Sequence, residues 1–378
     1  MLDNTQKRIL SFFTRNPSIA IHWINSNYPF SRGLFDVHGG VLNWQLISEN
    51  PNFVNDLEFI ERYTDKLDWS RLSEYISNSL FDEFTSRFYD KVIWSANSLP
   101  ETAAPFSLCF NMNLHWTLER IEKHEHNIDW DELSQNSNCF WSEQIIEKYS
   151  GMINWELFNS CHYVPYSEDF IDKFIGKIDH PYSQLGIPDD LGLVRKYMDD
   201  VSWRAVSYSE KIPWTVDLIR EWSDRLHLNT IITNRKAIDS IDKFNLLFSN
   251  FNDEKYEWLS FNRGTMWTWE LLEKHKDKWD WDMISINPSL PWSIELIEYF
   301  KDYLVFGKLT PCATEPDSYD IKTGMEMNPG IQWSIDLLEK YEGEWELGLM
   351  DDNPTVWEKA FKAHVNDEVV NLFLRISC

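Results

Sequence analysis

The sequence repeats itself with a period of about 25 residues, and this period constrains the fold more than any other feature. The clearest unit covers residues 281–300 and contains Asn287 and Trp292. A related unit begins at Trp130, and in both units an Asn follows the first Trp after six residues and a second Trp after eleven. Self-similarity at a fixed period is typical of stacked repeat architectures, in which each repeat packs on its neighbours.

Each unit is predicted to form a short first helix, a turn and a longer second helix. Asp280 precedes the first helix as an N-cap residue. We expect that helix to end at Asn287, because Asn tolerates the left-handed conformation and Pro288 prevents continuation. Ser293 then caps a second helix of about three turns, in which apolar residues recur on one face.

The predicted fold class is all-α, an α-solenoid of about 13 helical hairpins. Residues 1–18 form an N-terminal cap, 19–345 the helical repeat array, and 346–378 a C-terminal capping unit. The period is interrupted twice, by insertions near 95–113 and 310–326.

The 20 tryptophans need a structural explanation, which stacking provides. A hairpin of 25 residues cannot bury its Trp side chains alone, whereas stacked neighbours can. A fixed spacing also favours a core role over a ligand cage. We therefore assign these residues to the structural core: Trp44, Trp69, Trp130, Trp141, Trp155, Trp203, Trp214, Trp267, Trp281, Trp292 and Trp333.

The repeat resembles the Trp- and Asn-Pro-rich short helical repeats found in arrays from large DNA viruses and some bacteria. The match is clearest from Trp279 to Ile297, where a Trp-Asp-Trp triplet, an Asn-Pro pair and a further Trp stand in the same order. It recurs more loosely over most of the chain. The resemblance implies a helical array and brings with it no activity and no catalytic residues.

The charge balance restricts the class of partner. Lys and Arg total 35 against 61 Asp and Glu, a formal net charge of -26. Direct nucleic-acid binding is not expected, since phosphate neutralisation requires a basic surface. An acidic array instead favours a basic protein partner, such as a toxin or nuclease. Acidity that only keeps an aromatic-rich chain soluble is the competing interpretation.

Signatures of catalysis and cofactor binding are absent from the sequence. There are only 13 Gly, and no phosphate-binding, dinucleotide, zinc-protease or nucleophile-elbow motif. His124 and His126 are the nearest approach to a metal pair, but His124 occupies a repeat position held elsewhere by aromatic residues. We therefore predict no catalytic residue, no cofactor and no metal site, and no enzymatic activity.

The two insertions are the candidate contact sites, because insertions in a solenoid map to loops that often lie on the binding face. The first contains Glu101, and the second contains Glu315, Asp317 and Asp320 beside two prolines. We interpret these four acids as partner-binding residues. Neutral drift in a tolerant loop is the equally weighted alternative.

The resulting functional hypothesis is a non-enzymatic protein-binding repeat scaffold that engages a basic partner. An immunity protein, an inhibitor or a nucleic-acid mimic would be concrete forms. A structural or assembly scaffold is the alternative, and an enzyme or effector whose site uses the insertions is a third.

The chain is expected to be cytoplasmic. Its first 16 residues lack the apolar core of a secretory signal, and no run of about 18 apolar residues could cross a membrane. The five cysteines are odd in number and widely spread, a pattern typical of reduced thiols rather than disulfides.

Overall fold

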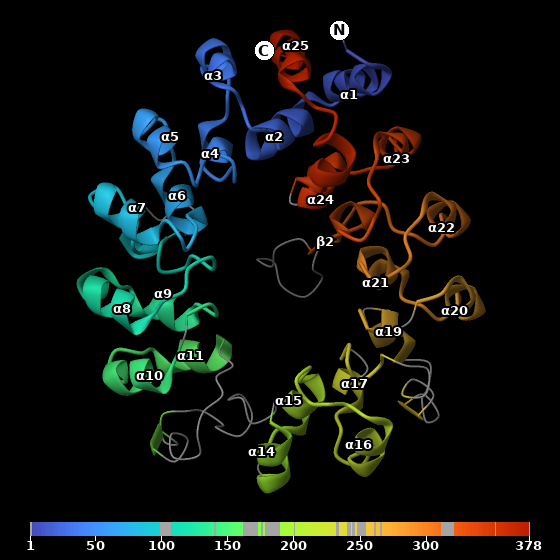
Figure 1. The fold of residues 1–378 in the computed structure, drawn as a ribbon. Coiled ribbons are helices and arrows are strands. Elements are labelled where there is room, and N and C mark those ends of the chain that lie inside the picture. Colours follow the sequence, from blue (N-terminus) through green and yellow to red (C-terminus); the bar gives the residue numbers. More distant parts are fainter. Residues whose placement is uncertain are drawn as a thin grey trace. The chain divides into compact units, whose positions relative to one another are not determined.

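The computed structural model is helical, apart from one pair of short strands (Figure 1). The all-α prediction is therefore confirmed, with that hairpin as the one departure in the described part of the chain. The residues described are 2–98, 107–139, 141–161, 173–174, 177, 190–199, 201–231, 234–239, 243, 246–247, 255–260, 262–264, 267–310, 321–351 and 353–377.

The chain divides into two compact units. Unit 1 comprises Met1–Ile24, Phe30–Asp36 and Val206–Cys378, and unit 2 comprises Asn25–Pro29 and Val37–Ala205. Three helices cross the divisions, namely α2 (Pro17–Asn27), α3 (Arg32–His38) and α15 (Trp203–Tyr208).

Unit 2 contains two parallel rows of helices (Figure 1). The first helices of its repeats are α4 (Trp44–Ile47), α6 (Trp69–Tyr75), α9 (Trp130–Gln135) and α11 (Trp155–Cys161). The second helices are α5 (Leu57–Arg62), α7 (Phe81–Arg87), α8 (Leu118–His124) and α10 (Glu143–Tyr149). The unit also has the 3-10 turns η1 (Ala96–Ser98) and η2 (Glu125–Asn127), and helix α14 (Leu191–Lys196).

Unit 1 repeats the same alternation. Its first helices include α17 (Leu228–Ile231), α19 (Lys255–Ser260) and α21 (Trp281–Ile286). Its second helices include α16 (Val216–Glu221), α20 (Trp269–Lys274), α22 (Ile294–Tyr299) and α23 (Ile335–Lys340). The remaining elements are α1 (Asn4–Arg15), β1 (Lys308–Thr310), β2 (Ile321–Thr323), η4 (Met325–Met327), η5 (Leu347–Met350), α24 (Pro354–Val356), the π-helical turn η6 (Trp357–Phe361) and α25 (Asp367–Ser377).

The predicted cap residues do cap their helices. Asp280 accepts a hydrogen bond from Met283 N–H at the start of α21, and Ser293 accepts one from Leu296 N–H at the start of α22. These side chains satisfy backbone donors that lack a partner inside the helix. The second helices are shorter than the predicted three turns: α22 has six residues and continues only as turns.

The asparagine that follows many of the first helices has a different role from the one predicted. Asn287 has φ -77° and ψ 112°, which is an extended rather than a left-handed conformation, so the predicted left-handed cap is wrong. Its side chain is buried, and its amide donates to the carbonyls of Ser260 and Asn262 at 2.9 Å each, in the preceding repeat. Its Oδ1 accepts from the N–H of Ser289, two residues later. One side chain therefore both ends a helix and joins two repeats.

The same arrangement recurs along both units, and we call it the asparagine ladder. In every case the buried side-chain amide donates to two backbone carbonyls of the repeat before it. Its described members are Asn50, Asn111, Asn136, Asn234, Asn287, Asn328 and Asn353. A buried carbonyl without a donor costs free energy, so these amides satisfy backbone groups that water cannot reach.

A serine four residues after the first aromatic residue of a repeat links that repeat to the next one. Ser285 Oγ donates to the Trp281 carbonyl at 2.6 Å and accepts from Val305 N–H at 2.9 Å, 20 residues later. Ser48, Ser73, Ser134, Ser207 and Ser260 accept from the backbone N–H 20 residues later in the same way. Successive repeats are therefore tied through backbone groups in both directions.

The structure divides the eleven predicted core tryptophans into two groups. The second Trp of each repeat is buried, and its group comprises Trp141, Trp214, Trp267, Trp292 and Trp333. The first Trp is only half-buried, and its group comprises Trp44, Trp69, Trp130, Trp155, Trp203 and Trp281.

The half-buried tryptophans are covered by neighbouring side chains. Lys66 Nζ lies 4.9 Å from the centre of the Trp44 ring, and Lys91 Nζ lies 5.4 Å from that of Trp69. In both pairs the Lys follows the Trp by 22 residues, and its ammonium group is attracted to the face of the ring. The rings of Trp44 and Trp69 are therefore not open stacking platforms.

Within unit 1, the two ends of the chain pack together. Helix α1 contacts α23 and α25. Phe13 lies 5.0 Å from Phe361 and 5.6 Å from Phe373, measured between ring centres. Arg8 pairs with Asp336 and Glu339 of α23, each at 2.6 Å. The N-terminal helix thus joins the C-terminal repeats as a packed element.

None of the described helices combines the length and the apolar character needed to cross a lipid bilayer.

Candidate partner-binding site

The four acids predicted to bind a partner lie outside the described residues. Glu101 belongs to the first insertion, and Glu315, Asp317 and Asp320 to the second. The described flanks of both insertions nevertheless show how the chain leaves and re-enters the repeat pattern.

The first insertion is held at both ends by one buried carboxylate. Glu132 in α9 accepts from Ala96 N–H at 2.6 Å, before the insertion, and from the Ser107 hydroxyl group after it. In addition, Leu108 N–H donates to the Ile93 carbonyl at 2.7 Å. Because the two ends are brought together, Asn111 keeps its place in the asparagine ladder, and the repeat pattern continues.

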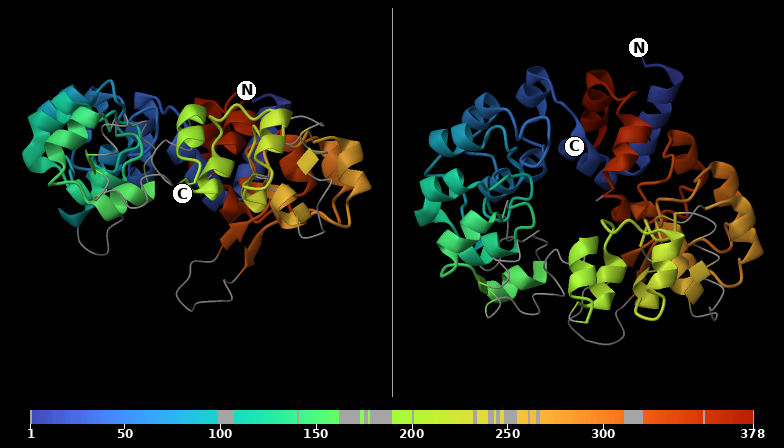
Figure 2. Two further views of the ribbon diagram at one scale, coloured as in Figure 1. Left: turned by 90° about the horizontal axis from the view of Figure 1, so that it is seen from below. Right: turned by 60° about the horizontal axis from the view of Figure 1, so that its bottom comes forward.

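The second insertion is anchored in a similar way by Glu326. Its side chain is fully buried and accepts from Gly307 N–H at 3.0 Å and from Glu346 N–H at 2.9 Å. Strands β1 and β2 pair antiparallel beside it, with Lys308 opposite Thr323, and they extend away from the helices of unit 1 (Figure 2). The second insertion is therefore fixed at its base by the Glu326 carboxylate and by the pairing of β1 with β2.

Burial raises the pKa of both carboxyl groups. Desolvation is the main cause for Glu132, and the hydrogen bonds from Ser107 and from the N–H of Ala96 act in the opposite direction. Desolvation also raises the pKa of Glu326, against the backbone N–H donors of Gly307 and Glu346. Both groups accept hydrogen bonds from the described ends of an insertion, so these contacts give them an anchoring role.

Sequence reasoning missed these anchors, although one of them leaves a signal. Glu326 stands two residues before a ladder asparagine, where other repeats have a serine such as Ser285. A longer acid at this position reaches two N–H donors where the serine reaches one. Glu132 occupies no such recognisable position, so its role requires the structure.

A half-buried carboxylate, Glu74, also has an altered pKa. Glu49 pairs with Arg71, while the buried Oε2 of Glu74 accepts no hydrogen bond from the described residues. Desolvation, countered in part by the charge of Arg71, raises the pKa of Glu74 to about 7. A carboxyl group with such a pKa can exchange a proton near neutral pH, but no nucleophile or cavity is described beside it.

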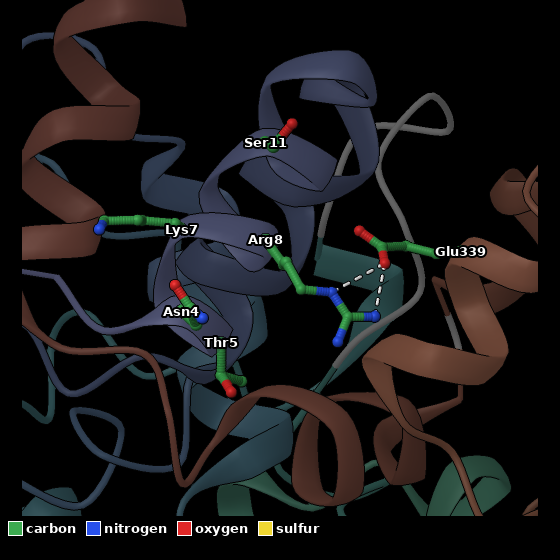
Figure 3. A pocket seen from close by; sticks show the side chains of 6 residues that line it. All are labelled: Asn4, Thr5, Lys7, Arg8, Ser11 and Glu339. Carbon is green, nitrogen blue, oxygen red and sulfur yellow. Dashed lines mark hydrogen bonds and ion pairs between the residues drawn. The ribbon is translucent and has the colours of Figure 1, made fainter.

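A hollow of about 490 Å³ lies beside the N-terminal helix (Figure 3). Five of its six lining residues come from α1, and the sixth is Glu339 of α23. Arg8 points across it and is hydrogen-bonded to Glu339 through both Nε and Nη2 (Figure 3). The hollow is thus the open side of the contact between the chain ends, and its two facing charges already satisfy each other.

His124 and the two cysteines Cys109 and Cys139 have packing roles, whereas His126 is exposed. His124 is buried, with its ring 4.9 Å from that of Trp94 and 5.5 Å from that of Phe81. Cys109 and Cys139 are buried free thiols. Among the described residues, no three His, Cys, Asp or Glu side chains converge to hold a metal ion. His180, which replaces the first Trp of its repeat and for which a structural role is predicted, lies outside the described residues.

Comparison with known proteins gives no relative. No protein-family model matches the chain, and no curated protein and no solved structure matches it significantly. The resemblance to viral and bacterial Trp-rich repeats therefore stays a prediction.

Proposed function

We propose that this protein is a non-enzymatic repeat scaffold that binds a basic protein. In this proposal the repeats form an α-solenoid of about 13 hairpins, and the partner is a toxin, a nuclease or another protein with a cationic surface. Inhibition of that partner, by covering its basic surface or by mimicking its nucleic acid, is the concrete form of the activity.

The observation that carries the proposal is the uncompensated acidic charge. Even if each of the 35 Lys and Arg side chains paired with its own carboxylate, 26 of the 61 acids would have no basic counterpart. A partner that supplies these cations gains favourable electrostatic energy and is steered toward the scaffold before contact.

The contacts between repeats strengthen this argument, because they already use many of the cations. Lys148 pairs with Glu122 at 2.6 Å, and Lys173 pairs with Glu147 at 2.7 Å, each 26 residues apart. Exposed acids such as Glu119, near the start of a second helix, form no ion pair within the described part of the chain. The surplus charge is therefore spread along the repeats and can face an extended partner.

A structural or assembly scaffold is the second candidate. It is supported by the asparagine ladder and by the serine contacts between repeats, which would hold the array together whether or not a partner binds. An enzymatic role built on the insertions would need groups that reach a substrate, whereas the described flanks of both insertions place their carboxylates in the protein interior.

The test uses defined basic proteins. The purified chain is titrated at low and at high salt with two basic proteins, a nuclease and a histone. An acidic protein serves as the control. We expect one basic protein to bind in a fixed stoichiometry, with an affinity that falls as salt rises. If the bound protein is a nuclease, its activity should fall over the same range of scaffold concentrations in which binding occurs.

Binding to none of the basic proteins, or turnover of a small molecule without a partner, would contradict the proposal. The predicted contacts in the insertions are tested in the same titration. Reversing the charges of Glu315, Asp317 and Asp320 should slow association mainly at low salt if the second insertion contacts the partner. Unchanged rates would assign binding to the helices.

A further inference from the structure

An exposed aromatic cluster lies on α20, on α22 and on the turn that follows α22 in unit 1. The ring of Trp269 in α20 lies 4.7 Å from that of Tyr299 in α22, and Tyr303 lies 5.0 Å from Trp281. Buried Phe300 connects the two pairs, 5.6 Å from Trp269 and 5.1 Å from Trp281. We call Trp269, Tyr299 and Tyr303 the aromatic patch. Their side chains are 37%, 53% and 38% exposed, which is unusual for adjacent large rings.

The patch exists because two repeat positions carry tyrosine instead of a cation. Tyr299 stands where the neighbouring second helices have Lys274 and Lys340. Tyr303 follows Trp281 by 22 residues, the spacing at which a lysine covers the ring elsewhere. Tyr256 illustrates the usual arrangement, with Lys278 Nζ 5.0 Å from its ring centre. Repeat packing therefore does not require these tyrosines, because other repeats manage with lysine.

The surroundings of the patch are acidic. Between Trp267 and Phe306 the chain has eight acidic and four basic residues, a net charge of -4. Glu270, Glu295 and Asp302 are exposed near the rings. Lys276, whose charge interacts with both tyrosines, is already paired with Glu273 at 2.8 Å.

Rings flanked by carboxylates suit one kind of group. A cation over an aromatic face is attracted by the ring, and guanidinium combines this with flat stacking and paired hydrogen bonds to carboxylates. Ammonium is more strongly hydrated and stacks less well. In several other repeats the protein's own lysine covers the ring, whereas here the covering side chain is Tyr303, whose exposed ring can receive a cation from outside.

We propose that the aromatic patch is a docking surface for an arginine-bearing segment of a basic protein. This inference rests on the proposed function and specifies where, and through which side chains, the scaffold makes contact. Trp and Tyr are also the residues that dominate the binding energy of protein interfaces.

The experiment uses two basic peptides of equal length, one rich in arginine and one rich in lysine, titrated calorimetrically into the full chain. The test variant combines Tyr299→Lys and Tyr303→Lys, which restores the residues typical of these repeat positions and should therefore fold. The charge-matched control combines Tyr89→Lys and Tyr208→Lys, two exposed tyrosines outside the patch. A second control, Tyr299→Phe with Tyr303→Phe, keeps the rings.

We expect the wild type to bind the arginine peptide more tightly than the lysine peptide. The test variant should bind the arginine peptide about tenfold more weakly, because two cation–π contacts are lost. The charge-matched control should change affinity by less than about twofold, as expected of scattered surface charges. The phenylalanine variant should bind like the wild type.

Equal weakening by the test variant and its charge-matched control would overturn the docking surface and leave the scaffold function standing, since only net charge would then matter. Binding of neither peptide to the wild type would overturn both. Light scattering tests whether the patch instead binds a second copy of this chain. A wild-type dimer that becomes monomeric in the test variant would also overturn the proposal.

Discussion

The second helices of unit 2 and those around α22 in unit 1 follow the same repeat pattern but present different surfaces. In unit 2, Arg87 pairs with Glu61 and Lys148 with Glu122, so that charges link one repeat to the next. Between α20 and α22, Tyr299 packs on Trp269 instead, and an ion pair of Glu298 with Lys340 links α22 only to α23. Beneath both surfaces the buried second Trp and the asparagine ladder are retained.

This difference indicates which positions define the fold and which remain free to vary. The interior contacts recur in both units, because each satisfies backbone groups that water cannot reach or fills space in the core. The exposed positions are held by weak contacts, so one repeat can carry ion pairs and another aromatic rings on the same backbone. A binding surface can therefore be placed on one repeat without changing its packing.

The largest expected effects concern the buried tryptophans, which should matter equally in the two regions. Trp141→Ala in unit 2 and Trp292→Ala in unit 1 should each lower the free energy of unfolding by about 3–5 kcal/mol, because each leaves a cavity. Half-buried Trp281→Ala should cost less. Urea unfolding measures all three. If Trp281→Ala proves the most damaging, the division between the two groups of tryptophans is wrong.

The asparagine ladder should likewise be equally important in both regions. Asn136→Ala and Asn287→Ala should each destabilise by about 2–4 kcal/mol, because two buried carbonyls lose their donor. Exposed Asn4→Ala serves as the control and should change little. Thermal unfolding followed by circular dichroism gives the comparison. A small effect at Asn287 together with a large one at Asn136 would mean that the interiors differ after all.

A pH effect should separate the two regions, because Glu74 in unit 2 has apolar Ile286 as its counterpart in unit 1. The folded state raises the pKa of Glu74 from 4.5 to about 7, so folding favours the protonated form. The associated stability is fully present below pH 4.5 and is lost as pH rises to about 7. Allowing for partial exposure, the loss should be about 1–2 kcal/mol. Glu74→Gln should remove this part of the pH dependence, whereas an unchanged profile would assign it to other groups.

The smallest effects concern the exposed contacts themselves, and salt should distinguish them. Arg87→Met keeps the aliphatic stem and should destabilise by about 0.2–1 kcal/mol at low salt, with the effect fading at high salt. Tyr299→Ala should cost about 0.5–1.5 kcal/mol at either salt concentration, because ring packing is not screened. Denaturation at two ionic strengths tests both variants. A salt-sensitive Tyr299 variant would contradict the distinction.

Much of the fold could be predicted from the sequence, because the repeat fixes helix positions through local rules. Asp280 and Ser293 are cap residues by type and position, and the structure places both at helix starts. The role of Asn287 could not be predicted from local rules. Its partners lie in the preceding repeat, and only the packing of two repeats reveals that their carbonyls need a donor.

The candidate site was harder to predict for a similar reason. A break in the period locates each insertion, but it does not identify Glu132, which lies in α9 and closes the first insertion through Ala96 and Ser107. For the aromatic patch, the repeat alignment shows tyrosine where neighbouring repeats have lysine, but it does not show that these rings are exposed. Exposure of Tyr299 and Tyr303 depends on which side chain covers which ring.

The contact between the chain ends has a consequence for how the protein folds. A repeat that touches only its neighbours can form as soon as it has been synthesised, whereas α1 has its packing partners near the other end of the chain. Gln6 donates to the His364 carbonyl across 358 residues of sequence, and Trp23 to that of Met350 across 327. On the ribosome, Phe12 and Phe13 must wait with their apolar surface uncovered until residues 361–373 emerge. Such distant contacts slow folding, so unit 1 is expected to be the last part of the chain to mature and the part most dependent on protection from aggregation.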